Sequence, residues 1–396
     1  MKKSILTLSL LLAFSQSALA KTVLAEDKKE LVLPTILQPK HSSVPISEIL
    51  KHQRKGPTIQ IAILLDTSGS MSGLIEQAKS QIYDIIIETS KANKDNKSAY
   101  IEVALFEYGK STVPAHQGHV KMLSPFTGDF DKLSLELFNL QTNGGEEYAG
   151  RAIMESASKL RWSRHKDDLK IILIAGNESF SQGFTRYDDA INYAKDKGII
   201  VNTMFCGDYE KGKYLEWENG ALLSGGAYLN INHNDAVEHI ESPYDDEINQ
   251  LGYALNKTYR SYRAEGKQTQ EMLDSVSGDK SKAALTSRNL AKASKSYDSK
   301  SWDMVGLFSN SKEEALIVAK KSEEFKGLSE EDIQKKLSES LEERKKIQEK
   351  INNLKLKREE YVKGIKSAKN KDTFGNKLIS EIREKAIEKG YSFQDK

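Results

Sequence analysis

A chain of 396 residues is long enough for two or three domains, at the usual allowance of about 100–200 residues each. Its composition, with 38% hydrophobic residues, 29% charged residues, 25 Gly and 7 Pro, excludes a collagen-like chain, a low-complexity chain and a membrane bundle. The 59 Lys and Arg nearly balance the 57 Asp and Glu, for a formal charge of +2, which excludes the concentrated basic excess of a nucleic-acid-binding surface.

The first 20 residues have the parts of a secretory signal peptide: two early lysines, an apolar run over residues 5–15 and a small-residue ending at Ala20. We expect cleavage after Ala20 and export to the periplasm or the medium of a bacterium. The apolar run is shorter than the roughly 20 residues of a membrane-spanning helix, and no later run replaces it, so we expect no transmembrane segment. Four prolines in residues 21–57 predict an extended N-terminal arm.

From Thr58 onward, apolar runs alternate with stretches of helical spacing. The run at 59–65 predicts a central strand buried on both faces, and residues 74–86 predict a helix. Further strands are predicted at 100–108, 170–175, 199–205 and 227–231, and further helices at 133–140, 148–160, 187–196 and 215–223. This alternation predicts parallel βαβ units, and therefore a doubly wound, mostly parallel α/β sheet over residues 58–240. Cys206, the only cysteine, directly follows the strand predicted at 199–205, and we expect a buried structural thiol there.

Beyond residue 240 the strand pattern stops. We predict a helical and irregular connector over 241–310, in which Trp302 docks the tail on the sheet domain, and a charged helical tail over 311–396. The tail carries an apolar stripe of Ile347, Ile351, Leu354, Tyr361 and Ile365. Two interpretations stay open: a coiled coil or hairpin, made with a second chain or with the chain's own end, and one helix packed by this stripe on its own domain.

Asp66, Ser68 and Ser70 form a DxSxS pattern in the turn after the first predicted strand. Alternate positions let one carboxylate and two hydroxyls face one point, and hard cations such as Mg²⁺ prefer oxygen ligands. Ligands of doubly wound sheets bind beyond the carboxyl ends of the strands, where this turn lies. The pentapeptide alone also fits an ordinary capped turn, because Asp, Ser and Gly are common turn residues.

This turn, the strand before it and Gly73-Leu74 after it resemble the von Willebrand factor type A (VWA) domain and its metal-ion-dependent adhesion site (MIDAS). The resemblance covers about residues 56–240. The segments 142–148, 174–178 and 202–208, together with the charged tail, are similar to a bacterial exported subfamily of this domain. The resemblance implies bound Mg²⁺ or Mn²⁺, completed by an acidic side chain of a partner protein, and thus a protein-binding module for adhesion or envelope assembly.

Two loops depart from the family pattern. Glu146 follows two glycines where the family usually has Thr, and the loop around Asn177 lacks the usual Asp. We therefore predict Glu146 as the fourth protein ligand, with Asn177 or Glu178 contributing through water. The alternative is a structural envelope protein whose tail self-associates and whose metal site is degenerate.

Motifs of covalent hydrolases and zinc proteases are absent from the sequence, which has neither a GxSxG elbow nor HExxH. Its seven histidines are scattered. We therefore expect a binding module and not an enzyme, and a hydrolase screen is the experiment that tests the rival class.

Overall fold

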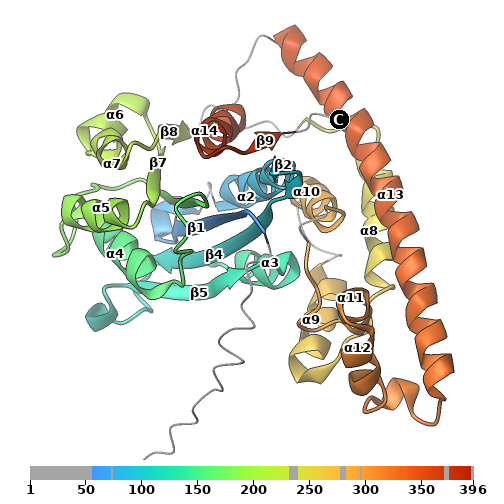
Figure 1. The fold of residues 1–396 in the computed structure, drawn as a ribbon. Helices are drawn as coiled ribbons and strands as arrows, with labels where there is room; N and C mark the ends of the chain where they lie inside the picture. The colour runs from blue at the N-terminus through green and yellow to red at the C-terminus, as the bar shows by residue number, and fades with distance from the viewer. Residues whose placement is uncertain are drawn as a thin grey trace, which may run out of the picture. The chain divides into compact units, whose positions relative to one another are not determined.

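The computed structural model describes residues 56–72, 75–231, 240–276, 282–294, 297–369 and 374–393. The predicted signal peptide and all but the end of the predicted arm lie outside the described residues. Residues 54–396 form one compact unit, in which a sheet region is followed by a series of helices (Figure 1). The sequence places domain boundaries at residues 240 and 310, and these two boundaries stay predictions.

Six strands form the main sheet, in the order β5-β4-β1-β6-β7-β8. Their bounds are β1 Thr58–Asp66, β4 Tyr100–Tyr108, β5 Val120–Thr127, β6 Leu169–Gly176, β7 Ile200–Cys206 and β8 Tyr228–Ile231. All neighbours pair in parallel except β4 and β5, which pair antiparallel with register shifts. The predicted doubly wound, mostly parallel sheet is confirmed, and β5 is the strand of this sheet that the prediction missed. Its mixture of buried and exposed residues gives no apolar run.

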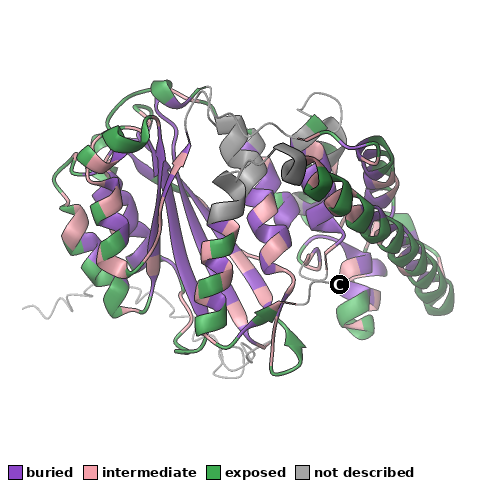
Figure 2. Cartoon of the chain, turned by 90° about the horizontal axis from the view of Figure 1, so that it is seen from above, coloured by how far each residue is buried: buried purple, intermediate pink, exposed green. Residues whose placement is uncertain are grey.

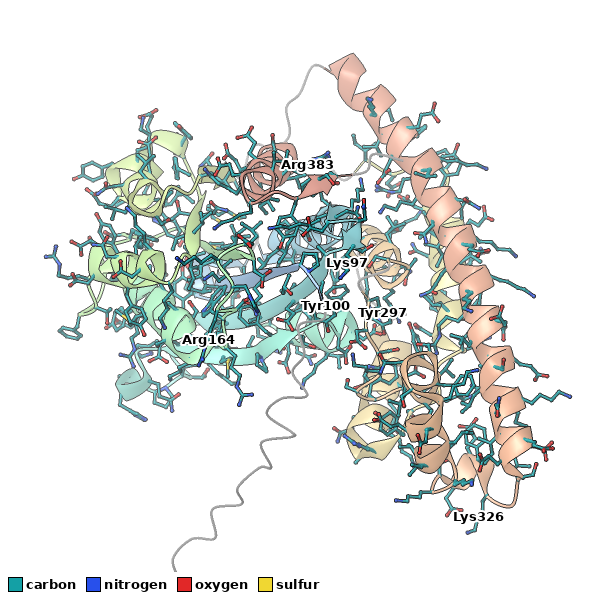
Figure 3. All side chains as sticks on the ribbon, viewed as in Figure 1. Lys97, Tyr100, Arg164, Tyr297, Lys326 and Arg383 are labelled. Carbon is teal, nitrogen blue, oxygen red and sulfur yellow. The ribbon has the colours of Figure 1, made fainter. Side chains whose placement is uncertain are left out.

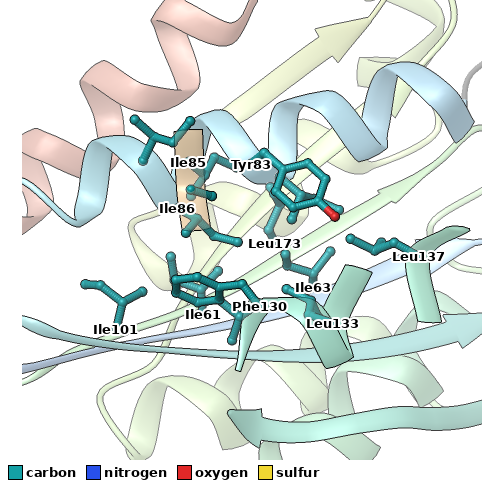
Figure 4. Packing of buried hydrophobic residues seen from close by; sticks show 14 of the residues in the cluster. Ile61, Ile63, Tyr83, Ile85, Ile86, Ile101, Phe130, Leu133, Leu137 and Leu173 are labelled. Atoms are coloured by element: carbon teal, nitrogen blue, oxygen red, sulfur yellow. The ribbon is translucent and has the colours of Figure 1, made fainter. Parts of the chain in front are cut away.

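Both faces of β1 are buried, because its side chains alternate between two hydrophobic clusters. Ile61 and Ile63 pack with residues of helices α2 and α3 (Figure 4). Ala62 and Leu64 pack with residues of α4, α5 and α7 on the other face. Figure 2 shows the resulting buried strands between partly exposed helices. The bounds are α2 Ile75–Thr89, α3 Phe130–Phe138, α4 Ala149–Lys159, α5 Tyr187–Asp196, α6 Tyr209–Tyr214 and α7 Trp217–Ser224.

Helices α8 and α10 share the core of the sheet, whereas the buried residues of α11 and α12 form a separate cluster. Leu255 of α8, Leu290 of α10 and Trp302 belong to the same hydrophobic cluster as Ile61. Trp302 is therefore buried, as predicted, and packs with its ring centroid 5.1 Å from that of Tyr259. The bounds are α8 Asp245–Asn256, α9 Arg263–Val276, α10 Lys282–Lys292, α11 Met304–Asn310 and α12 Lys312–Ala319.

Helix α13, Glu330–Lys369, has 40 residues and contacts α8, α10, α11 and α12. Three residues of the predicted stripe, Ile347, Ile351 and Leu354, are buried in the common core. Arg358 interrupts the stripe and forms an ion pair with Asp245 of α8, with Nε 2.8 Å from Oδ1. Thus α13 packs by one stripe on its own domain. The middle of the predicted seam is therefore occupied within the chain, and self-association through the tail stays a prediction.

The end of the chain returns to the sheet region. Helix α14, Phe374–Glu388, contacts α2, and Arg383 Nη1 lies 2.7 Å from Glu88 Oε1 (Figure 3). The last strand, β9 Ser392–Phe393, pairs with β2 Ala92–Lys94, which also pairs with β3 Lys97–Ser98. In the part of the chain that the structure describes, no helix is long and apolar enough to cross a membrane.

Candidate metal centre

The DxSxS turn lies at the carboxyl end of β1, where the sequence placed it. Asp66 and Ser68 are fully buried, whereas Ser70, in the short 3-10 helix Gly69–Met71, is exposed. The backbone N–H of Ser68 donates to Asp66 Oδ1 at 2.7 Å, and the Oγ atoms of Ser68 and Ser70 lie 2.9 Å apart. One carboxylate and two hydroxyls therefore meet in one turn.

A second loop, residues 142–148, is tied to this turn by backbone hydrogen bonds. The N–H of Gly69 donates to the carbonyl of Gly144 at 3.2 Å, and the N–H of Asn143 donates to the carbonyl of Thr67 at 2.9 Å. These bonds run in both directions between the two loops. The second loop is thus held at a fixed position beside the DxSxS turn.

The third loop follows β6 and brings Asn177 to the same place. Ser70 Oγ donates to Asn177 Oδ1 at 3.1 Å. Glu178 is exposed, and its charge acts on Asp66. The backbone carbonyl of Glu178 accepts from Trp217 Nε1 at 2.7 Å, which anchors the loop. Asn177 and Glu178 therefore lie at the predicted site, one in contact with Ser70 and the other near Asp66.

Glu146, the predicted fourth ligand, is directed elsewhere. It is exposed, and its Oε2 accepts a hydrogen bond from the Tyr148 hydroxyl at 2.9 Å. Glu147 instead is buried, with its carboxyl group close enough to Asp66 and Ser68 for both residues to affect its pKa. Glu146 forms an isolated antiparallel bridge with Gly109, and neighbouring residues of an extended backbone point to opposite sides. The structure therefore places Glu147, and not Glu146, beside Asp66, and the choice of the fourth ligand stays a prediction.

Gly109, which the sequence analysis missed, makes room for both carboxyl groups. Its φ is +82°, a backbone conformation that favours glycine. A Cβ atom there would lie 2.7 Å from Asp66 Oδ1 and 3.1 Å from Glu147 Cγ. The backbone N–H of Glu147 also donates to Gln182 Oε1 at 2.5 Å. Glu147 is thus fixed by contacts at its backbone and along its side chain.

The Asp66 and Glu147 carboxyl groups perturb each other. Burial raises the pKa of both groups, and the charge of Asp66 raises the pKa of Glu147 further. One oxygen of each, Asp66 Oδ2 and Glu147 Oε2, is buried without a hydrogen-bond partner among the described residues. Two adjacent carboxylates repel when both are ionised, so the pair requires a shared proton or a cation.

The residues present fit a hard divalent cation. Every candidate ligand is an oxygen: two carboxyl groups, two hydroxyls and the Asn177 amide, the donor set that suits Mg²⁺ or Mn²⁺. No group of three or more His, Cys, Asp or Glu able to hold a metal occurs among the described residues, so the set depends on its serines. A bound cation would supply the positive charge that the two carboxylates lack.

Cys206, at the end of β7, has the environment of a structural thiol. Its side chain is buried. Burial, followed by the charge of Asp66, raises the pKa of the thiol, which therefore stays protonated at neutral pH. A buried, protonated thiol is a poor nucleophile, in agreement with the sequence-based expectation.

Comparisons with known proteins give matches of fold. No family model and no curated protein matches the sequence. Among solved structures, BatB from Bacteroides thetaiotaomicron is 16% identical with a TM-score of 0.36, covering 45% of this chain and 93% of BatB. The SpRpn10 VWA domain is 16% identical with a TM-score of 0.33, covering 44% of this chain and 88% of that domain.

A third match is proximal thread matrix protein 1 from the mussel byssus, described as having a zinc-occupied MIDAS motif. It is 11% identical with a TM-score of 0.35, and the match covers 46% of this chain and 43% of that protein. These likenesses concern the fold alone, and each covers less than half of this chain.

Proposed function

We propose that this chain is an exported, metal-dependent protein-binding module of the VWA kind. Mg²⁺ or Mn²⁺ would be held by Asp66, Ser68 and Ser70, with Asn177 and one glutamate of the second loop close by. The observation that carries the proposal is the meeting of three loops around buried carboxyl oxygens that lack hydrogen-bond partners in the described residues.

The surface beside this site supports protein binding. Phe184 is 98% exposed, and its ring lies edge-on to Tyr148, with 6.5 Å between the ring centroids. The Tyr148 hydroxyl donates to Glu146, so this aromatic pair adjoins the second loop of the site. Aromatic residues are enriched in protein interfaces, so this exposed pair supports a binding surface beside the second loop.

Export is part of the proposal because of the signal-peptide pattern that ends at Ala20. The periplasm and the medium are both consistent with it. The rival function, a structural protein that assembles through its tail, loses its main support because Ile347, Ile351 and Leu354 are buried within the chain.

Isothermal calorimetry of the mature protein with Mg²⁺ and Mn²⁺ tests the metal site. We expect one cation per chain for the wild type and at least about tenfold weaker binding for Asp66→Ala, because the variant loses a charged ligand. Cation at about 100 times the wild-type Kd should raise the free energy of unfolding of the wild type by about 2.7 kcal/mol and that of the variant by at most about 1.4 kcal/mol.

Asp189→Ala is the matched control, since it removes an exposed carboxylate on α5. It should bind the cation as the wild type does. Equal heats for the wild type and Asp66→Ala would overturn the proposed function. Circular dichroism of each variant checks that the chain is folded.

A further inference from the structure

Glu147 occupies the inner side of the second loop. Its side chain is 4% exposed, and it contacts the same Gly109 that borders Asp66. Its N–H donates to Gln182 and its carbonyl accepts from Ala149, so its backbone is held from both sides. The backbone of Glu147 is therefore fixed, and its buried carboxyl group lies on the side of Asp66.

The charges at the centre are then balanced within the chain. A divalent cation carries two positive charges, and Asp66 and Glu147 supply two negative charges. Glu178, which follows Asn177 in the third loop, adds a further carboxylate at this end of the sheet. A further carboxylate from another protein would lose its hydration and meet no net positive charge, an unfavourable exchange.

We infer that Glu147 is an internal carboxylate ligand, and that the partner group facing the cation is a neutral oxygen donor, such as a carbonyl or hydroxyl, and not an acidic side chain. This inference rests on the proposed function. It differs from what the VWA resemblance implies, because here the acidic group belongs to the chain itself. The unpartnered Oε2 of Glu147 and Oδ2 of Asp66, both buried, are the atoms that carry it.

The first test compares Mn²⁺ affinity among four forms of the full mature chain: wild type, Glu147→Gln, Glu146→Gln and Asp66→Ala. Glu147→Gln should weaken Mn²⁺ binding at least about tenfold, because one charged ligand becomes neutral. Glu146→Gln is the matched control, the same change one residue away on the exposed side, and should leave the affinity within about threefold of the wild type.

The second test uses acetate as the simplest carboxylate. Acetate is titrated onto the Mn²⁺-loaded proteins while the relaxation rate of water protons reports displacement of water from the metal. Acetate should displace water in Glu147→Gln at concentrations that leave the wild type unchanged. Equal acetate binding by both proteins would overturn the assignment of a neutral partner group.

The outcomes separate this inference from the proposed function. Wild-type Mn²⁺ affinity in Glu147→Gln, together with lost binding in Asp66→Ala, would overturn the role of Glu147 and leave the metal-dependent function standing. Retained binding in Asp66→Ala would overturn both. Thermal unfolding without metal serves as the folding check. Glu147→Gln should unfold no earlier than the wild type, because a glutamine beside Asp66 needs neither a shared proton nor a cation.

Discussion

Gly109 is the residue on which the geometry of the site depends. It follows β4, and its positive φ turns the chain so that Asp66 and Glu147 lie against its Cα hydrogens. Gly145, only two residues before Glu147, has open space around the position of a Cβ atom. Two glycines of the same site therefore have different roles, one required by close contacts and one free of them.

We expect Gly109→Ala to lower the free energy of unfolding by about 1–3 kcal/mol, through backbone strain and the clash with Asp66. It should also weaken Mn²⁺ binding, because the carboxyl pair must move. Gly145→Ala is the control and should stay within about 0.5 kcal/mol of the wild type. Urea unfolding and calorimetry measure the two effects, and equal behaviour of the two variants would contradict the role of Gly109.

Helix α13 shows how one long helix is accommodated on its own domain. Most of its residues are charged or polar, yet Ile351 is fully buried against the shared core. Leu356, five residues later, is 47% exposed. Arg344 also enters the core side, with Nη1 2.7 Å from Asp303 Oδ2 and Nε 3.0 Å from Thr258 Oγ1. The helix is therefore held by a mixed stripe of apolar and ion-paired residues.

Replacing Ile351 by Ala should lower the free energy of unfolding by about 2–5 kcal/mol, the usual loss for a buried isoleucine. Leu356→Ala, on the exposed side of the same helix, should change it by at most about 0.5 kcal/mol. Urea unfolding at several protein concentrations is the measurement. A loss that disappears at high concentration would mean that the stripe is buried between chains.

Buried charges join the sheet region to the helices that follow it. Asp131 of α3 is fully buried, with Arg288 Nη2 at 2.8 Å and Lys292 Nζ at 3.1 Å, and it accepts from the Tyr297 hydroxyl. Burial alone would raise its pKa, but Lys292 and Arg288 hold it below the usual value. Removing one partner from such a buried cluster leaves an uncompensated charge, so these ion pairs contribute to holding the helices on the sheet region.

Asp129, which caps α3 beside this cluster, has the opposite shift. Burial first and the charge of Asp131 second raise the pKa of Asp129 to about 7. The folded state then binds a proton more tightly than the unfolded chain, where the pKa is about 4. The contribution of Asp129 to stability is therefore complete below about pH 4 and is lost as the pH rises to about 7.

Asp129→Asn should remove this loss of stability with rising pH. The variant should keep the N-cap of α3, because an Asn oxygen can still accept from the N–H of Lys132. Between pH 5 and pH 8, the free energy of unfolding of the wild type should fall by on the order of 1–3 kcal/mol more than that of the variant. Urea unfolding across this range is the check, with the exposed Asp189→Asn as control. Parallel pH profiles for the wild type and Asp129→Asn would refute the shift.

The strand and helix pattern of residues 58–231 was largely readable from the sequence, because strands buried on both faces are apolar runs and their helices have a clear spacing. The DxSxS turn was also readable from the sequence, because its three residues lie within one pentapeptide. The edge strand β5 was not readable, because only two of its eight residues are buried, so its sequence has no continuous apolar run.

Only the tertiary structure decided which glutamate faces Asp66 and what covers the tail. The sequence does not distinguish the adjacent residues Glu146 and Glu147 as candidate ligands. The bridge between Gly109 and Glu146 determines which of the two side chains points inward. The apolar stripe of α13 fits a second chain as well as it fits α8 and α10, and the choice follows from contacts between residues distant in sequence. Local pattern determines the type of an element, whereas its partner depends on where the whole chain brings it.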